Sequence, residues 1–534
     1  MSANRFDPVR LAVLRDLLES VTEEVAITCR RTAVSPNIKE RRDLSAALFD
    51  VDGRLLAHAA HIPVHLGAMP RSVEAVRATL KLAPGEAAIV NDPYAGGSHL
   101  PDLTLVRGVF EPGRTRPCGY LAVRAHHADV GGAVPGSMAP QDDVHAEGVR
   151  IPPLVAVRGD ELDPVFATLF FANVRHADER EADLRAQAGS LARGEARLHE
   201  LAASRGGVGA LLREGADLVA YARRMVEQAL RALPDASTTV EVALDADDRQ
   251  GRPATIRVAF GKRGGRLTVD FAGTTGPVGD GLNAPRAVTE SAVYYLLACL
   301  APPHTPPNGG LLEAARLRVP AGSLLDAPPP QPVAGGNVET SQRIVDALWL
   351  AAAACWPGRI PAPGSGSMSN WTFGPVPDGP AFPVYYETLP GGAGGGPEGP
   401  GPDAIQQHMT NTLATPAETL ERRWPVRVRR HGTRRGARAI GAAPGGAGLV
   451  REIELLVPAR ASFLMTRHAT APPGVAGGAP GAPGRIAVIR AGRRRRLAAR
   501  GVVRLDRGDI VRIETPGGGA HGAPAGVRPA ARRG

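Results

Sequence analysis

Histidine and aspartate are concentrated in one part of this 534-residue chain. Seven of its 14 histidines lie between residues 58 and 145. Imidazole nitrogens and carboxylate oxygens together suit a borderline-to-hard divalent ion such as zinc, manganese or iron, whereas a purely structural core has little use for so many titratable groups. Residues 40 to 150 are therefore predicted to hold a metal-centred active site. The aspartates interleaved with the histidines are Asp43, Asp92, Asp102 and Asp129.

A loop at residues 91 to 102 carries the first pair of candidate ligands. It follows a predicted strand, and its glycine pair at 96 and 97 lets the backbone double back so that His99 and Asp102 point into one cavity. Pro93 and Pro101 stiffen the loop, as a metal site requires. On spacing alone, a hydrogen-bonded turn explains the same four residues equally well.

A second pair of histidines ends the strand predicted at residues 119 to 126. Because adjacent residues of a strand face opposite sides, only one of His126 and His127 can be a ligand, and the other is left to contact substrate or to orient a ligand. Asp43 is the expected fourth ligand, because an acid entering an apolar strand needs a partner. The predicted ligand set is Asp43, His99, Asp102 and His126, and the predicted catalytic residues are His127, Asp129 and Glu147.

The other histidines of this region have simpler interpretations. A lone histidine is more often a hydrogen-bonded structural residue than a ligand, which is the interpretation favoured for His58, His61 and His65. They remain candidates for orienting a ligand. His145 and Glu147 lie in a polar loop, where they are either surface residues or part of a lid that carries an acid.

The pattern of elements predicts a mixed α/β, multidomain fold. A helix capped by Asp7 runs to about residue 31, a hairpin spans 44 to 58, a helix covers 72 to 82, and strands follow at 86 to 91, 104 to 110 and 119 to 126. Glycines 206 and 207 separate two amphipathic stretches of a predicted helical hairpin. The expected divisions are an N-terminal metal-site domain (1–177), the helical hairpin (178–233), a central α/β domain (234–390), a mobile Gly/Pro-rich loop (391–404) and a β-rich C-terminal domain with a basic tail (405–534).

Composition excludes several classes of function. The net charge of +10 comes from 60 arginines and 3 lysines beside 64 glycines and 49 prolines, a skew typical of a GC-rich genome rather than of a nucleic-acid-binding protein. The arginine run at 493 to 496 is expected at an exposed hairpin. No GxxxxGK[ST] phosphate loop occurs. Four unpaired cysteines, no signal peptide and no apolar run near the ~18 residues of a spanning helix favour a cytoplasmic protein without a membrane partner.

Several separated motifs together resemble the hydantoinase B/5-oxoprolinase family, whose relatives include subunits of acetone and acetophenone carboxylases. They lie at residues 35–43, 61–67, 91–102, 126–132, 147–153, 335–342, 386–388, 408–412 and 472–474. The resemblance implies one component of an ATP-dependent cyclic amide hydrolase, with ATP bound by a hydantoinase A-like partner in a hetero-oligomer. It also implies metal ligands at Asp43, His99, Asp102 and one of residues 126 and 127. Family members often end in a Gly-rich segment with Tyr-Gly-Asp-Pro, whereas here the Gly-rich segment at 517 to 524 lacks that motif and leads into an Arg-rich tail.

Three hypotheses follow from the sequence. The first is hydrolysis of a hydantoin, 5-oxoproline or similar lactam after its phosphorylation by the partner. The second is a ketone carboxylase with the same architecture, which would need bicarbonate rather than an amide. The third is a metal-binding scaffold or a basic nucleic-acid-associated protein without catalysis, against which the intact ligand positions argue.

Overall fold

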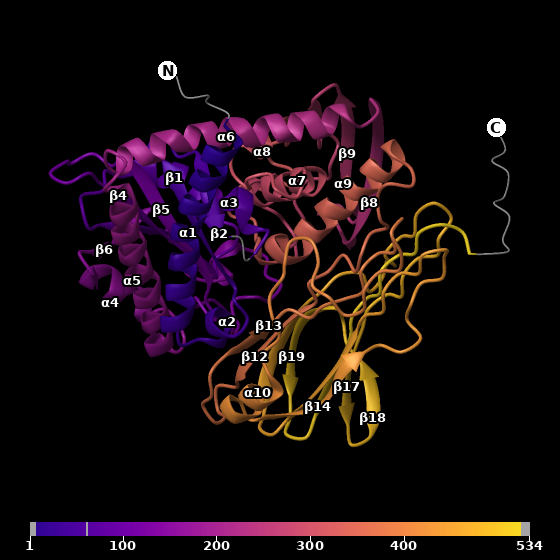
Figure 1. The fold of residues 1–534 in the computed structure, drawn as a ribbon. Helices are drawn as coiled ribbons and strands as arrows, with labels where there is room; N and C mark the ends of the chain where they lie inside the picture. Colours follow the sequence, from indigo (N-terminus) through magenta and orange to yellow (C-terminus); the bar gives the residue numbers. More distant parts are fainter. Residues whose placement is uncertain (1–6, 60–61, 525–534) are drawn as a thin grey trace.

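The computed structural model describes residues 7 to 59 and 62 to 524, which form four β-sheets with helices packed between and around them (Figure 1). The mixed α/β, multidomain class is confirmed. Helix α1 (Pro8–Thr32) begins as the sequence predicts, because the Asp7 carboxylate accepts the main-chain N–H groups of Val9 and Arg10 and proline occupies the first helical position.

A seven-stranded antiparallel sheet forms the N-terminal region. Its spatial order is β2-β1-β5-β4-β3-β6-β7. Helices cover both faces of the sheet, so its four longest fully buried strands, β1, β2, β4 and β5, have no exposed residue. Strand β6 is buried only at its two middle-to-late residues, Ala156 and Val157. The strands are β1 (Leu44–Asp50), β2 (Leu55–Ala59), β3 (Ala87–Val90), β4 (Asp102–Val109), β5 (Gly119–His126), β6 (Leu154–Arg158) and β7 (Glu161–Leu162).

Helices pack on each face of this sheet. On one face lie α1, α5 (Ala177–Ala202) and α6 (Val208–Arg231), and on the other lies α3 (His65–Thr79), which begins at His65 rather than at residue 72. The two helices of the predicted hairpin are separated at Gly206 and Gly207 and then diverge. Helix α5 packs along α1, while α6 crosses to the second sheet (Figure 1). Two short helices, α2 (Pro36–Lys39) and α4 (Pro164–Phe171), complete the region.

A four-stranded sheet with three helices forms the central region. Strands β8 (Ala236–Asp247), β9 (Pro253–Arg263) and β10 (Arg266–Asp270) are antiparallel, as predicted, and β11 (Ala315–Arg318) adds a parallel edge strand. Helix α9 (Ser341–Cys355) packs on β8 and β9, and α7 (Arg286–Leu300) links it to α3 of the first domain. The short helix α8 (Gly310–Glu313) contacts α6.

Two further sheets form a C-terminal β-sandwich around the buried aromatic residues Trp371, Phe373, Tyr385 and Phe463. One sheet has the order β13-β12-β16-β19 and the other β14-β15-β20-β17-β18. The strands are β12 (Asn370–Pro375), β13 (Tyr385–Glu387), β14 (Val426–Thr433), β15 (Leu449–Leu455), β16 (Ala459–Leu464), β17 (Arg485–Arg490), β18 (Arg493–Arg496), β19 (Arg500–Leu505) and β20 (Ile510–Glu514), with helix α10 (Ala417–Arg423) at one edge.

Two features of this sandwich differ from the sequence-based expectation or refine it. Strands β12 and β13 pair with β16, so residues 370 to 387 share a sheet with the C-terminal strands, although the sequence assigned them to the central domain. The arginine run is strand β18 itself, fully exposed and hairpinned to β17. Of the four cysteines, all free, only Cys29 is buried, and Cys299 is exposed.

Glycine-rich extended segments run side by side beyond the sandwich, and we call them the glycine bundle (Figure 1). They comprise residues 361–364, 391–403, 441–448, 472–482 and 515–522. Main-chain hydrogen bonds join them, for example from Gly392 N to the carbonyl of Pro516 (3.0 Å) and from Gly518 N to the carbonyl of Gly446 (2.9 Å). The loop expected to be mobile is therefore held in place, because the glycines of these segments let their main chains approach closely enough to pair.

In the part of the chain that the structure describes, no helix combines the length and apolar character required to cross a membrane.

Candidate metal centre

The candidate site lies at the end of three neighbouring strands. Asp102, the first residue of β4, is paired directly with His126, the last residue of β5. The main-chain N–H of His126 also bonds the carbonyl of Asp43, just before β1, so the three residues form one row across the sheet. Residues opposite each other on adjacent strands present their side chains on the same face. The strand register therefore explains how residues 43, 102 and 126 come together.

The loop before β4 brings His99 to the same place. Gly96 adopts a left-handed conformation (φ 89°), and a Cβ there would lie 2.4 Å from the carbonyl oxygen of Arg71. A Cβ at Gly97 would lie 2.4 Å from the carbonyl oxygen of Asn91. Only glycine permits this tight packing of the loop against α3 and β3. The predicted role of the glycine pair in turning the loop agrees with this geometry.

His99, Asp102 and His126 form a compact, buried group. One ligand atom from each lies within 4.8 Å of the others, and each side chain is at most 2% exposed. His99 Nδ1, Asp102 Oδ1 and His126 Nε2 have no hydrogen-bond partner. Buried polar atoms are nearly always paired, so a compact group in which each residue leaves one atom unpaired fits a site for a cation.

Electrostatics prepare these groups for a cation. Burial alone would raise the pKa of Asp102. His99 and His65 stabilise its charged form, however, and they hold the pKa of Asp102 well below its ordinary value. Burial lowers the pKa of His126 well below its ordinary value, assisted by His99. An ionised carboxylate and a neutral imidazole are the forms that bind a divalent ion.

Asp43 lies beside this group but outside the set of three. Its side chain is 5% exposed, and burial raises its pKa to about 7, with Asp102 adding to the rise and Arg41 and His99 opposing it. Its position in the same row of the sheet is compatible with the predicted fourth ligand. That role stays a prediction.

Residues from distant segments close the site, and sequence reasoning did not nominate them individually. Asn337 Nδ2 lies 3.1 Å from His99 Nε2 and 3.5 Å from Asp102 Oδ2, and it comes from a π-helical turn, η3 (Gly336–Thr340), before α9. The ring of Tyr386 stacks on His126 at 4.4 Å between centroids. Asn37 Nδ2 lies 3.4 Å from His126 Nδ1. The only signals for these residues were the family motifs that contain them.

The three residues predicted to be catalytic make their contacts elsewhere. His127 faces the opposite side of the sheet, where its Nε2 lies 2.9 Å from Gln187 Oε1 on α5. Asp129 accepts the main-chain N–H groups of Gly131 and Gly136 and an ion pair from Arg175 at 3.0 Å, so it shapes its own loop. Their contacts add no support for catalysis.

Glu147 is buried rather than exposed on a lid, at 2% exposure. Its two oxygens accept the N–H groups of Val333 and Ala334, and it thereby links the N-terminal region to the segment before η3. Burial raises its pKa to about 8 even though these two hydrogen bonds favour the ionised form. Its contacts are those of a buried acid joining two parts of the chain.

Replacing Glu147 with glutamine should flatten the pH dependence of stability. An unfolded glutamate titrates near about 4.3, so between that pH and about 8 the folded protein holds a proton that the unfolded chain has released. The free energy of unfolding contributed by this group therefore falls as pH rises, by at most about 1.4 kcal/mol per pH unit. Urea unfolding from about pH 5 to 8 measures the slope. Equal slopes in the wild type and Glu147→Gln would contradict this result, and exposed Glu398→Gln serves as the control.

The remaining histidines of this region agree only in part with the structural and surface roles expected from the sequence. His65, for which a structural role was favoured, lies with Nε2 at 3.4 Å from Asp102 Oδ2 and Nδ1 at 2.9 Å from Ser45 Oγ, so it orients the aspartate. His58 lies edge-on to Tyr294. His145 is exposed and bonds Asp143, as the surface interpretation expects. His61 lies outside the described residues.

Comparison with known proteins identifies the family of this chain and agrees with its fold. The family model described as hydantoinase B/oxoprolinase matches residues 7–524. The chain therefore belongs to the hydantoinase B/oxoprolinase family. It is 36% identical to 5-oxoprolinase 1 of Arabidopsis thaliana over 98% of this chain and 42% of that protein, and 28% identical to a putative D-/L-hydantoinase component of a Pseudomonas species over 91% and 84%. The chain thus spans less than half the length of the Arabidopsis 5-oxoprolinase.

Two solved structures share this fold. The ATP-dependent caprolactamase of Pseudomonas jessenii superposes with a TM-score of 0.87 at 26% identity, covering 99% of this chain and 93% of that one. Nucleotide-free acetone carboxylase superposes with a TM-score of 0.86 at 17% identity, covering 97% and 76%. The second likeness, at this low identity, concerns the fold alone.

Proposed function

We propose that this chain is the metal-binding, ring-opening component of an ATP-dependent cyclic amide hydrolase. The observation that carries the proposal is the compact buried group of His99, Asp102 and His126, each with one unpaired polar atom, within a chain of this family. Asp43 completes the ligand set. Two imidazoles and two carboxylates fit zinc, manganese or iron.

The chemistry needs both activation and charge stabilisation. An unstrained amide carbonyl is a poor electrophile, and phosphorylation of its oxygen by a partner creates a leaving group. A bound divalent ion supplies acidified water or stabilises the developing oxyanion. His99, Asp102 and His126 hold that ion, while Asn337, Asn37 and Tyr386 fix the planes of the imidazoles.

A separate partner chain is proposed to bind ATP. This sequence contains no phosphate loop, and the Pseudomonas relative is named as one subunit of its hydantoinase. We assign ATP binding to a hydantoinase A-like protein, so that the working enzyme is a cytoplasmic hetero-oligomer.

Cyclic amides are favoured over ketones as substrates. The names of the Arabidopsis and Pseudomonas relatives and of the caprolactamase refer to lactams or hydantoins, and the acetone carboxylase likeness is too distant in sequence to argue for chemistry. Carboxylation remains the alternative, and it would require bicarbonate.

The deciding experiment co-purifies the chain with its hydantoinase A-like partner, measures bound metal, and assays ATP turnover with 5-oxoproline, hydantoins and caprolactam. We expect about one metal ion per chain and ring opening that needs ATP and both chains. ATP turnover that depends on bicarbonate and a ketone, with no response to any amide, would replace the proposal with the carboxylase. Wild-type chain that binds no divalent metal would overturn the site.

A further inference from the structure

Arg124 is a buried cation beneath the candidate metal centre. It lies on β5 two residues before His126, paired across the sheet with Ser45 on β1 and Thr104 on β4, so its row lies directly next to that of Asp43, His126 and Asp102, on the same face. Its side chain is fully buried. Burial lowers its pKa to about 10, which leaves it charged at neutral pH. A charge buried in this way is costly and calls for a physical reason.

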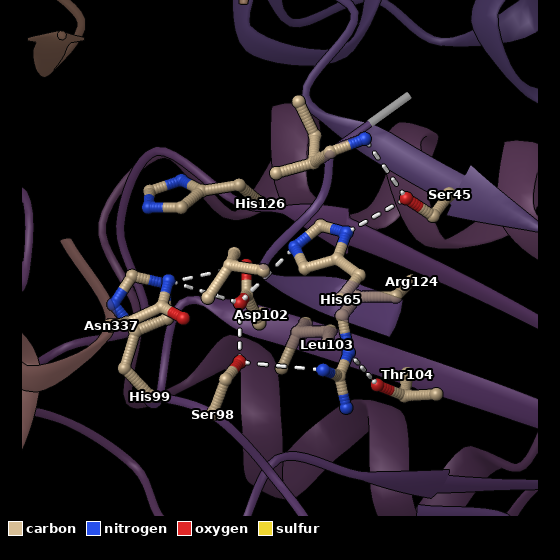
Figure 2. Close-up of polar contacts among 12 residues, drawn as sticks. Ser45, His65, Ser98, His99, Asp102, Leu103, Thr104, Arg124, His126 and Asn337 are labelled. Carbon is tan, nitrogen blue, oxygen red and sulfur yellow. Dashed lines mark hydrogen bonds and ion pairs between the residues drawn. The ribbon is translucent and has the colours of Figure 1, made fainter. Parts of the chain in front are cut away.

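The guanidinium of Arg124 contacts hydroxyl groups and takes part in none of the ion pairs among the described residues. Its Nε donates to Thr104 Oγ1 at 2.8 Å and its Nη1 to Ser98 Oγ at 3.4 Å (Figure 2). Its Nη2 donates to Ser72 Oγ at 2.8 Å. The Asp102 carboxylate offsets part of the cost of burying this charge from a distance, but no carboxylate pairs directly with the guanidinium, as a role in stability alone would favour. The three hydroxyls therefore point to a different purpose.

Arginine fixes the direction of every hydrogen bond around it, because a guanidinium donates and never accepts. Each hydroxyl that it contacts must use a lone pair toward the arginine, so its own proton points elsewhere. Ser98 then donates to Asp102 Oδ2, at 2.5 Å. Ser72 donates to the carbonyl of Gly96, at 2.8 Å. A single cation thus orients both the metal-facing carboxylate and the turn that carries it.

The two oxygens of Asp102 are consequently unequal. Oδ2 receives Ser98 and Asn337 and lies 3.4 Å from His65 Nε2, whereas Oδ1 has no hydrogen-bond partner and lies 3.3 Å from His99 Nε2 (Figure 2). Saturating one oxygen leaves the other to bind a cation. The network therefore selects binding through Oδ1 alone.

We infer that Arg124 is a positioning residue of the metal centre, which acts through Ser98 on Asp102 and through Ser72 on the glycine turn, so that Asp102 presents Oδ1 to the ion. This inference rests on the proposed metal site. It assigns Arg124 a geometric role that a lysine cannot fill, because an ammonium group lacks the planar fork that reaches three hydroxyls at once.

The test uses Co²⁺ as the probe, since its visible absorption reports coordination geometry and its affinity can be measured without turnover. Orientation of a ligand by its hydrogen-bond partners is worth roughly 10- to 100-fold in metal affinity. We expect Arg124→Lys, Ser98→Ala and Ser72→Ala each to weaken Co²⁺ binding within that range and to alter its spectrum. Arg124→Lys combined with Ser98→Ala should bind no more weakly than the worse single variant, because both remove the same link.

A purely electrostatic role for Arg124 predicts the opposite pattern. Removing a positive charge near a cation site would tighten Co²⁺ binding in Arg124→Met and leave Arg124→Lys unchanged, and either result would overturn the inference. Additive losses in the double variant would do the same. If the Arg124 variants fail to fold, Ser98→Ala and Ser72→Ala still test the inference. Unchanged Co²⁺ affinity in both would show that Arg124 does not act on the site through these two hydroxyls.

The matched control is Thr22→Val, which deletes a buried hydroxyl on α1, across the sheet from the site. It should leave Co²⁺ affinity and spectrum unchanged. Thermal unfolding of every variant separates lost folding from lost positioning. Wild-type protein that binds no Co²⁺ would contradict the proposed function itself. Normal Co²⁺ binding by the wild type, with unchanged affinity in the variants, would contradict only the role of Arg124.

Discussion

Asp102→Asn is expected to abolish metal binding and ring opening while the protein stays folded. The substitution keeps the shape of the side chain but removes the ionised carboxylate of the compact group, whose charge His99 and His65 sustain. An ion that loses one of its two carboxylate ligands loses several kcal/mol of stabilisation, so we expect metal affinity and kcat to fall on the order of 10³-fold. Metal analysis and the partner-dependent ring-opening assay measure the two losses.

Asp143→Asn provides the control for this result, because Asp143 is an exposed acid paired with His145. Its metal content and turnover should match those of the wild type. Full metal occupancy in Asp102→Asn, with an unchanged Co²⁺ spectrum, would place the ion elsewhere. A variant that is unfolded by circular dichroism would instead require the comparison to be repeated with Asp102→Ala.

Gly518→Ala should destabilise the C-terminal region severely. Gly518 lies within the glycine bundle, where an added Cβ would sit 1.9 Å from the carbonyl oxygen of Ala393, and rigid main chain cannot give way. Forcing extra atoms into packed structure costs about 3 kcal/mol or more when no side chain can move aside. The midpoint of denaturant unfolding and the yield of soluble protein report the loss.

Gly432→Ala is the matched control for the bundle. Gly432 lies on β14, and a Cβ there would meet nothing within 4 Å. Its free energy of unfolding should stay within about 0.5 kcal/mol of the wild-type value. Similar unfolding midpoints for the two alanine variants would show that the glycine bundle tolerates side chains.

The sequence alone predicted that His99, Asp102 and His126 lie together in the candidate site. The HxxD spacing of His99 and Asp102 and the strand ending at His126 are local features, and strand alternation correctly required His126 and His127 to face different ways. The closing residues Asn337 and Tyr386 lie more than two hundred residues further along. Their contacts depend on how the domains dock, which no local pattern encodes.

The contacts made by the polar loops were not predictable from the sequence, and the catalytic roles of Asp129 and Glu147 stay predictions. Asp129 and Glu147 stood near the histidines in sequence, yet their carboxylates accept main-chain N–H groups of neighbouring loops. A loop acid satisfied by main-chain donors has the same sequence signature as a catalytic acid. Gly- and Pro-rich stretches were misinterpreted for a related reason, because their pairing partners lie far away in the chain.

The glycine bundle also constrains when this protein can finish folding as it leaves the ribosome. Residues 515 to 522 emerge after every other segment of the bundle, yet Pro516, Gly518, Gly519 and Ala520 bond segments near residues 392, 446, 363 and 479. Some of those segments already bond one another, as Ala362 bonds Gly395 and Gly446 bonds Ala393, but each of them lacks part of its pairing until residues 515 to 522 are translated. The bundle therefore stays incomplete while more than 150 residues are synthesised, and incompletely folded chains are those that most need chaperones.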